Sequence, residues 1–169
     1  MFQQALPKQV DYIKAAQRLA SYHVDVPVSC FVEFEKAILS ADDQVRGELK
    51  FSFNDHYQVQ IKGHINAKIH LICQRCMEPV EYLINAELNL VMVSAEQEKH
   101  LDKRFDPWLI ESEAVDLNKI VEQELIIALP IVVYHDNTLC NEQNTTKNNL
   151  ANNEKENPFL VLNSLKKKT

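Results

Sequence analysis

Glycine is the residue that this chain most clearly lacks, since its 169 residues include only Gly47 and Gly63. That is about 1 per cent, against an average usage of about 7 per cent. A P-loop, a dinucleotide fingerprint and a kinase phosphate loop each need two or three glycines within a few residues, because backbone amides must approach phosphate closely. The two glycines here are far apart. The sequence therefore argues against the common nucleotide-binding folds, and no small-molecule nucleotide is expected as a ligand.

Long apolar runs and an excess of positive charge are also lacking. No stretch of 18 apolar residues occurs, so no membrane span is expected. Residues 1–8 lack a charged segment followed by an apolar run, so no secretory signal is expected, and the four cysteines then indicate reduced thiols in the cytoplasm. Lys and Arg number 18 against 24 Asp and Glu, a net charge of −6. Nonspecific RNA coating needs the opposite sign, so RNA contact is expected only locally or through a protein partner.

What is present is the composition of a globular domain, with 46% hydrophobic and 25% charged residues. Helical spacing predicts a first helix over 11–22, whereas 31–39 fits either a short helix or a strand. Asp116 is predicted to cap a further helix that Pro130 ends. Glu122 and Glu124 are expected on the solvated side of this helix. Its predicted apolar stripe consists of Leu117, Ile120, Val121, Ile127 and Ala128.

From Arg46 onward the apolar period changes to two. Four alternating runs predict an antiparallel β-meander with one buried face, and their apolar positions fall within 49–53, 57–61, 65–71 and 80–92. Asn54-Asp55 indicates a turn, and Gly63 a turn or bulge between two runs. Residues 94–114 are predicted to cross over the fold as a polar loop, with Asp106-Pro107-Trp108 breaking the pattern. The predicted fold class is α+β, an antiparallel meander of about four or more strands packed with two or three helices.

The chain is predicted to form a single α+β domain over residues 1–140. The Asn-rich segment 141–157 has little to bury and is predicted to be a disordered linker. Residues 158–169 are expected to be a short apolar docking segment with a basic tail, in which Asn157-Pro158 resembles a helix start. Such a segment docks on its own domain or on a partner. Its Lys166–Lys168 tail is interpreted as a solubilising end in preference to an RNA contact.

The one compact chemical signal is Cys73-Gln74-Arg75-Cys76, at the predicted turn between the third and fourth runs. Two thiolates at this spacing can chelate one metal ion, and Cys140 with His135 would complete a tetrahedral zinc site. The alternative is a pair of half-buried thiols at a sheet edge. Redox catalysis is less favoured, because thioredoxin-type cysteines begin a helix, whereas Pro79 and an alternating run follow here. Cys30 is predicted to be a core residue.

Catalytic signals are thin. The six histidines are scattered, and no arrangement of nucleophile, base and orienting residue is evident. The sequence therefore does not predict an enzyme. Arg75 is the candidate RNA contact, since a guanidinium at a turn can bind phosphate through two hydrogen bonds.

Three separated blocks of the sequence resemble one protein family. The first is LICQRCMEP at 71–79; the second is DL at 116–117 with VEQELIIALP at 121–130, running on to HD at 135–136; the third is NPFLVL at 157–162 with LK at 165–166. Their combination, order and separation resemble the YceD family, the large ribosomal RNA subunit accumulation proteins. The resemblance covers nearly the whole chain.

The resemblance implies a non-catalytic bacterial and plastid factor, needed for normal synthesis or accumulation of 23S ribosomal RNA and typically encoded beside a large-subunit ribosomal protein. Many relatives carry a second cysteine cluster after the position of His135, which would complete a metal site with the CxxC pair. This chain keeps only Cys140 there. The departure weighs against a bound metal, so the preferred expectation is no cofactor, with zinc as the alternative.

Together, these arguments predict that the Cys73–Cys76 turn lies beside the helix ending at Pro130, with 130–136 as a nearby loop. The expected partner is a ribosome-assembly protein or the 23S rRNA precursor. The alternatives are a zinc-stabilised adaptor using the CxxC pair, and a thiol oxidoreductase. The residues expected to bind a partner are Gln74, Arg75, Pro130, His135, Pro158 and Phe159.

Overall fold

The computed structural model describes residues 6–41, 44–110, 112–137 and 140. The chain divides into two compact units, Met1–Tyr134 and His135–Thr169. The helices and strands given below belong to the first unit. The predicted linker 141–157 and docking segment 158–169 lie outside the described residues. Within the described ranges, no helix is long and apolar enough to cross a membrane.

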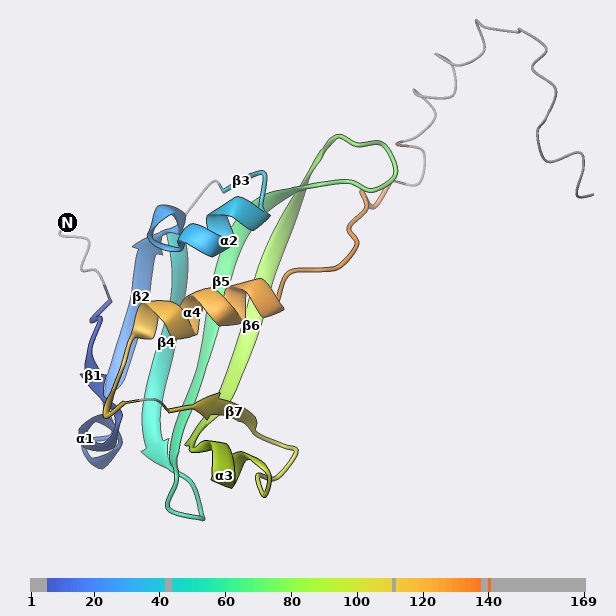
Figure 1. Cartoon of the computed structure of the whole chain (residues 1–169). Coiled ribbons are helices and arrows are strands. Elements are labelled where there is room, and N and C mark those ends of the chain that lie inside the picture. The colour runs from blue at the N-terminus through green and yellow to red at the C-terminus, as the bar shows by residue number, and fades with distance from the viewer. Residues whose placement is uncertain (1–5, 42–43, 111, 138–139, 141–169) are drawn as a thin grey trace, which may run out of the picture. The chain divides into compact units, whose positions relative to one another are not determined.

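A six-stranded sheet forms the body of the first unit (Figure 1). The strands lie in the order β2-β4-β5-β6-β7, and β3 pairs separately with the end of β5. All pairs are antiparallel except β6 with β7. The bounds are Ser21–Pro27 (β2), Ser40–Ala41 (β3), Gln44–Phe53 (β4), Val59–Ile72 (β5), Pro79–Val93 (β6) and Asp106–Leu109 (β7), while β1 (Val10–Asp11) and β8 (Ala114–Val115) form a separate two-stranded sheet. The predicted α+β class is confirmed.

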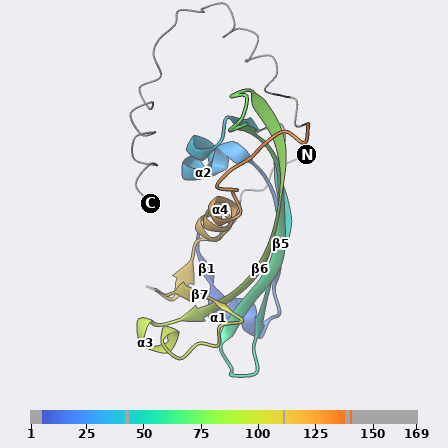
Figure 2. The ribbon, with the colours of Figure 1, turned by 90° about the vertical axis from the view of Figure 1, so that its right-hand side faces the viewer.

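Two helices cover one face of the curved sheet. Figure 2 shows α2 and α4 on the same side of the long strands. As predicted, the Asp116 carboxylate caps α4, accepting a hydrogen bond from the Asn118 N–H at 2.9 Å, and the helix ends before Pro130. The helical bounds are Tyr12–Gln17 (α1), Val28–Cys30 (η1, a 3-10 turn), Val32–Ala37 (α2), Ala95–Glu98 (α3) and Leu117–Ile127 (α4).

The covered face of the sheet is apolar because successive side chains along a strand alternate between its two faces. Leu49 of β4, Ile65 of β5 and Ile84 of β6 are at most 1% exposed. Each such aliphatic side chain contributes about 1.5–3 kcal/mol through burial. The packing between α4 and the sheet therefore holds both in place. The fully buried residues of α4 are Leu117, Ile120, Val121 and Leu125.

Both glycines lie within strands, where they permit a close approach between backbones. A Cβ on Gly47 would overlap the carbonyl oxygen of His64 in β5, and a Cβ on Gly63 would overlap that of Glu48 in β4. The missing side chains allow β4 and β5 to pack this tightly where the sheet curves. The predicted break at Gly63 is wrong, because β5 runs without interruption from Val59 to Ile72.

Other predictions are wrong where tertiary pairing overrides local pattern. The first helix ends at Gln17, and residues from Ser21 form β2 because β4 supplies their pairing partner. Residues 106–109, predicted as loop, form β7, whose Pro107 is tolerated on an edge strand. Cys30, predicted in the core, is exposed at the end of η1. The ambiguous segment 31–39 contains α2.

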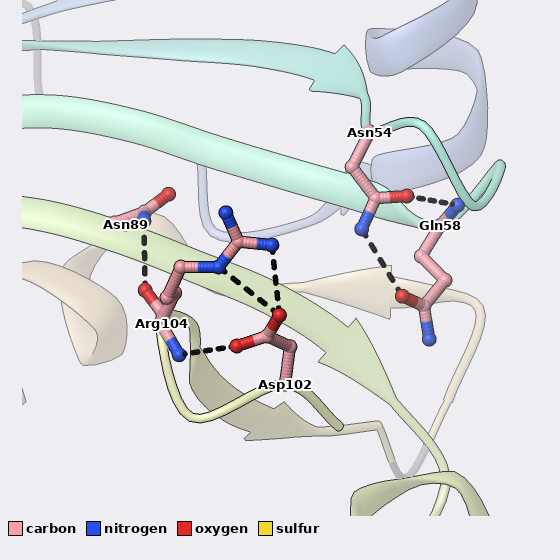
Figure 3. A network of polar contacts seen from close by, with 5 residues as sticks. All are labelled: Asn54, Gln58, Asn89, Asp102 and Arg104. Carbon is pink, nitrogen blue, oxygen red and sulfur yellow. Dashed lines mark hydrogen bonds and ion pairs between the residues drawn. The ribbon is translucent and has the colours of Figure 1, made fainter. Parts of the chain in front are cut away.

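Polar contacts close the loops at one end of the sheet (Figure 3). In the β4–β5 turn, the carboxamide oxygen of Asn54 accepts hydrogen bonds from two backbone N–H groups of the turn, each at 2.9 Å. Before β7, the Asp102 carboxylate accepts bonds from the backbone and guanidinium of Arg104 at 2.8–3.0 Å. The Asn89 amide donates to the Arg104 carbonyl at 3.1 Å. These side chains thus supply hydrogen-bond partners for backbone N–H and carbonyl groups of the loops.

Candidate functional site: the cysteine turn

The turn Cys73–Glu78 joins β5 to β6, at the opposite end of β5 from the β4–β5 turn. The Cys73 N–H donates to the Glu78 carbonyl at 3.0 Å, and the Met77 N–H donates to the Cys73 carbonyl at 2.9 Å. Met77 has a φ of 63°, in the left-handed region that non-glycine residues rarely adopt. The closing bonds therefore hold a backbone that is strained at Met77.

Both cysteines of the turn are buried. Cys73 is 0% exposed and Cys76 is 6% exposed, so they are more enclosed than the predicted half-buried pair. The prediction that a strand follows them is confirmed, because β6 begins at Pro79. The thiols therefore do not begin a helix, which is the arrangement that activates redox cysteines. Their burial and spacing are instead typical of structural metal ligands.

The segment after α4 runs beside this turn. The Gln74 N–H donates to the Val133 carbonyl at 3.0 Å. The Arg75 guanidinium lies over the ring of Tyr134, 4.9 Å from its centroid, as a cation–π contact. Two predicted partner-binding residues, Gln74 and Arg75, are thus joined to the loop that Pro130 begins. The expectation that this loop lies near the turn is confirmed for residues 133 and 134.

His135 and Cys140 supply the remaining candidate ligands. A single peptide bond joins His135 to Tyr134, so their Cα atoms are about 3.8 Å apart. In the second unit, the Cys140 N–H donates to the Asn137 carbonyl at 3.4 Å. Of the four candidate ligands, Cys73 and Cys76 lie in the first unit, and His135 and Cys140 lie in the second. These are the four residues that the sequence suggested.

The donor chemistry of this group fits zinc. Three thiolates and one imidazole make a closed tetrahedral set, with typical Zn–S distances of about 2.3 Å and Zn–N distances of about 2.0–2.1 Å. The exposed Cys30 is not part of the group. One cysteine after His135 is sufficient, because four ligands are then present.

A groove of about 350 Å³, lined mainly by aliphatic residues, lies next to the turn. Gln74 and Pro130, both predicted to bind a partner, contribute to its wall. The groove therefore brings two elements of the predicted contact surface into one feature. Its apolar lining includes Ile38, Leu39, Leu71, Ile72, Ile131 and Val133.

Several aliphatic side chains around this groove face solvent. Ile131 is 100% exposed and Leu39 is 51% exposed. Ile127, predicted in the buried stripe of α4, is 74% exposed, and Leu125 takes the buried position instead. The sequence analysis missed this surface, although the run Ile131-Val132-Val133 directly after Pro130 was a usable signal.

The two carboxylates of α4 have different environments. The Glu122 carboxylate accepts hydrogen bonds from the N–H groups of Glu33 at 2.7 Å and Phe34 at 3.3 Å. It thereby caps α2, whose own N-cap residue supplies no side-chain acceptor. Glu122 is half-buried, so it keeps partial contact with solvent while it caps α2. Burial raises the pKa of Glu124, and the negative charge of Asp106 raises it further.

The remaining predicted partner contacts have two different outcomes. Pro158 and Phe159 lie outside the described residues. Arg75, the candidate phosphate contact, has its guanidinium against Tyr134. The described candidate site is therefore a buried CxxC turn with an apolar groove beside it.

Comparison with known proteins connects this arrangement to a family. The family model described as large ribosomal RNA subunit accumulation protein YceD matches residues 61–166, which include the cysteine turn, α4 and the segment after it. A Haemophilus influenzae protein named large ribosomal RNA subunit accumulation protein YceD is 32% identical over 171 residues, covering 96% of this chain and 97% of that protein. No solved structure matches the chain significantly. The family match and the nearly full-length relative show that this chain belongs to the YceD family.

Proposed function

We propose that this protein is a ribosome-biogenesis factor that promotes the synthesis, processing or accumulation of 23S ribosomal RNA and catalyses no reaction itself. The observation that carries the proposal is the nearly full-length similarity to a protein named for accumulation of the large ribosomal RNA subunit. The match to the family model, which bears the same name, supports it. The proposed compartment is the cytoplasm, where bacterial ribosomes assemble.

The proposed contact surface is the cysteine turn together with the segment after α4. The bond from Gln74 to Val133 and the stacking of Arg75 on Tyr134 support a surface formed jointly by these two segments. Pro130 adds to it by lining the groove. The proposed partner is a ribosome-assembly protein or the 23S rRNA precursor. His135, Pro158 and Phe159 are proposed as further contacts on the sequence argument alone.

Depletion of the protein in its natural host tests this function. We expect the ratio of 23S to 16S rRNA to fall, and the wild-type gene to restore it. Pulse labelling separates the stages, because a synthesis defect lowers labelled precursor and a processing defect raises it. An unchanged ratio in fully depleted cells contradicts the proposal.

The C-terminal residues 158–169 are proposed to be a docking segment tethered by 141–157. A chain that ends at residue 156 should keep its unfolding temperature and bind assembly partners more weakly. Replacing Lys166–Lys168 with alanine is the matched control, because it removes charge and keeps the apolar residues. If crosslinking recovers pre-23S rRNA and large-subunit proteins equally with the truncated and full chains, the docking role is refuted.

A zinc-stabilised adaptor is the second candidate function. The donor types of Cys73, Cys76, His135 and Cys140, three thiols and one imidazole, favour it. Zinc bound there would hold the turn, and with it one wall of the groove, in a single conformation. Elemental analysis of protein purified without added metal should give about one zinc per chain. A content near zero excludes a structural zinc and leaves the first function unaffected.

A further inference from the structure

The groove beside the cysteine turn is lined mainly by aliphatic residues. Single exposed apolar residues are ordinary, whereas an apolar groove with exposed aliphatic neighbours marks an interaction site. Its walls have fixed backbones, since Gln74 N–H donates to the Val133 carbonyl at 3.0 Å and Leu39 N–H to the His70 carbonyl at 2.9 Å. Ile131, which also lines the groove, is fully exposed. A partner would therefore bind without ordering this part of the chain first.

The chemistry of the groove favours a protein over RNA as its occupant. Single-stranded RNA is bound by cationic channels with aromatic side chains on which bases stack. The lining here is mostly aliphatic. Arg75 directly follows Gln74 of the groove lining, and its guanidinium makes a cation–π contact with the ring of Tyr134. Aliphatic walls instead match the apolar side chains of a peptide segment.

Charge indicates what kind of protein this would be. The chain carries a net charge of −6. The elements that line the groove carry both signs of charge. Helix α2 has exposed Glu35 and Lys36, and the cysteine turn has exposed Glu78 and half-buried Arg75. Proteins that bind ribosomal RNA carry an excess of Lys and Arg. A chain of net negative charge with an aliphatic groove is complementary to such a protein, because opposite charges steer the encounter and apolar contact holds the complex.

We propose that this groove binds an apolar segment of a basic, rRNA-binding protein of the large subunit. The chain then affects ribosomal RNA through that protein. This inference rests on the proposed function. It chooses between the two kinds of partner, protein and RNA, that the proposed function leaves open. The bound partner would cover Ile131 and Leu39, whose exposure is otherwise unfavourable.

A binding experiment with purified components tests the inference. The probes are the total proteins of the large ribosomal subunit extracted free of RNA and, separately, deproteinised 23S rRNA. Each is passed over the immobilised full chain, and retained proteins are identified by mass spectrometry. The test variant is Ile131→Asp, which removes no packing because Ile131 is fully exposed. The matched control is Leu83→Asp, which places the same charge on a 58% exposed leucine of β6.

We expect the wild type and Leu83→Asp to retain the same one or few large-subunit proteins. Ile131→Asp should weaken this retention by about tenfold or more, as for a residue central to an interface, with an unchanged unfolding temperature. Equal retention by Ile131→Asp overturns the inference, and so does retention of rRNA without protein. Binding seen only with the chain that ends at residue 156 also overturns it, because the occupant would then be the C-terminal residues of the chain itself.

The failure of this inference can be told apart from failure of the proposed function. If depletion lowers the 23S to 16S ratio and Ile131→Asp restores it fully, the groove is not the contact and the function stands. If depletion leaves the ratio unchanged, the function itself is wrong, whatever the groove binds.

Discussion

The two ends of strand β5 differ in how their polar and apolar groups are placed. At the β4–β5 turn, Asn54 bonds to the backbone of its own turn, and nearby Asp102 does the same for Arg104. At the other end, the turn buries Cys73 and Cys76 while aliphatic side chains around it face solvent. The first end is closed by local hydrogen bonds, whereas the second carries exposed aliphatic side chains of the kind that mark interaction sites. The contrast supports the proposal that the cysteine turn is the functional end of the strand.

Helix α4 links the two regions. Its Glu122 carboxylate caps α2, whose last residue, Ala37, lines the groove. Its Glu124 carboxylate is affected by the charge of Asp106 in β7, the strand that follows the polar loops. Substitutions at either end and on α4 therefore test whether the ends are independent.

Cys76→Ser should have the largest effect, because it removes a buried thiol from the cysteine turn itself. If the chain is the zinc-stabilised adaptor proposed as the second candidate, losing one thiolate should abolish stoichiometric zinc and lower the unfolding temperature by about 10 °C, since metal-binding free energy contributes to folding. Elemental analysis and calorimetry measure these changes. Cys30→Ser is the matched control at an exposed cysteine and should change neither quantity. Equal zinc content in the two variants would show that the CxxC pair does not bind the metal.

Asn54→Ala should destabilise the β4–β5 turn without affecting the cysteine turn. The variant loses an acceptor for two backbone N–H groups, which costs about 1–2 kcal/mol and lowers the unfolding temperature by about 3–6 °C. Zinc content and retention of large-subunit proteins should not change. Asp55→Ala, at the adjacent exposed position of the same turn, should be nearly neutral. A loss of partner binding in Asn54→Ala would show that the two ends are coupled.

Glu122→Ala should have a smaller effect, confined to the contact between α2 and α4. Loss of this cap should cost about 1 kcal/mol. The amide hydrogens of Glu33 and Phe34, which the carboxylate binds, should exchange with solvent faster. Glu122→Gln should preserve most of the protection, because its carbonyl oxygen can still accept a bond. Unchanged exchange at both amides in Glu122→Ala would rule out the capping role.

Glu124→Gln should give the smallest change, and it should be stabilising. Burial first, and Asp106 second, raise the pKa of Glu124 above its ordinary value of 4.5 in the folded chain. The folded state therefore holds this proton more tightly, so the resulting stability is present below pH 4.5 and is lost as pH rises through the raised pKa. The variant should unfold about 1–2 °C higher than the wild type at pH 7. It should match the wild type at pH 4, and a lower unfolding temperature at pH 7 would reverse the expected sign.

Local pattern predicted the elements whose state depends on their own residues. The alternation in 49–53 and 80–92 lies within β4 and β6, and the Asp116 cap lies at the start of α4. By contrast, β7 is a strand because β6 pairs with it, although Pro107 locally argues against one. Gly63 has the sequence context of a turn, and only the close approach of the Glu48 carbonyl shows why glycine is needed in a continuous strand.

For the candidate site, the sequence by itself determined the spacing of Cys73 and Cys76, the types of metal ligand, the acidic net charge and the family resemblance. These properties follow from composition and from short-range order along the chain. Only the tertiary structure decided that Val133 bonds to Gln74 and that Ile131 lies exposed at a groove. The physical reason is that contacts between residues distant in sequence depend on how α4 packs on the sheet, and that packing depends on the whole core.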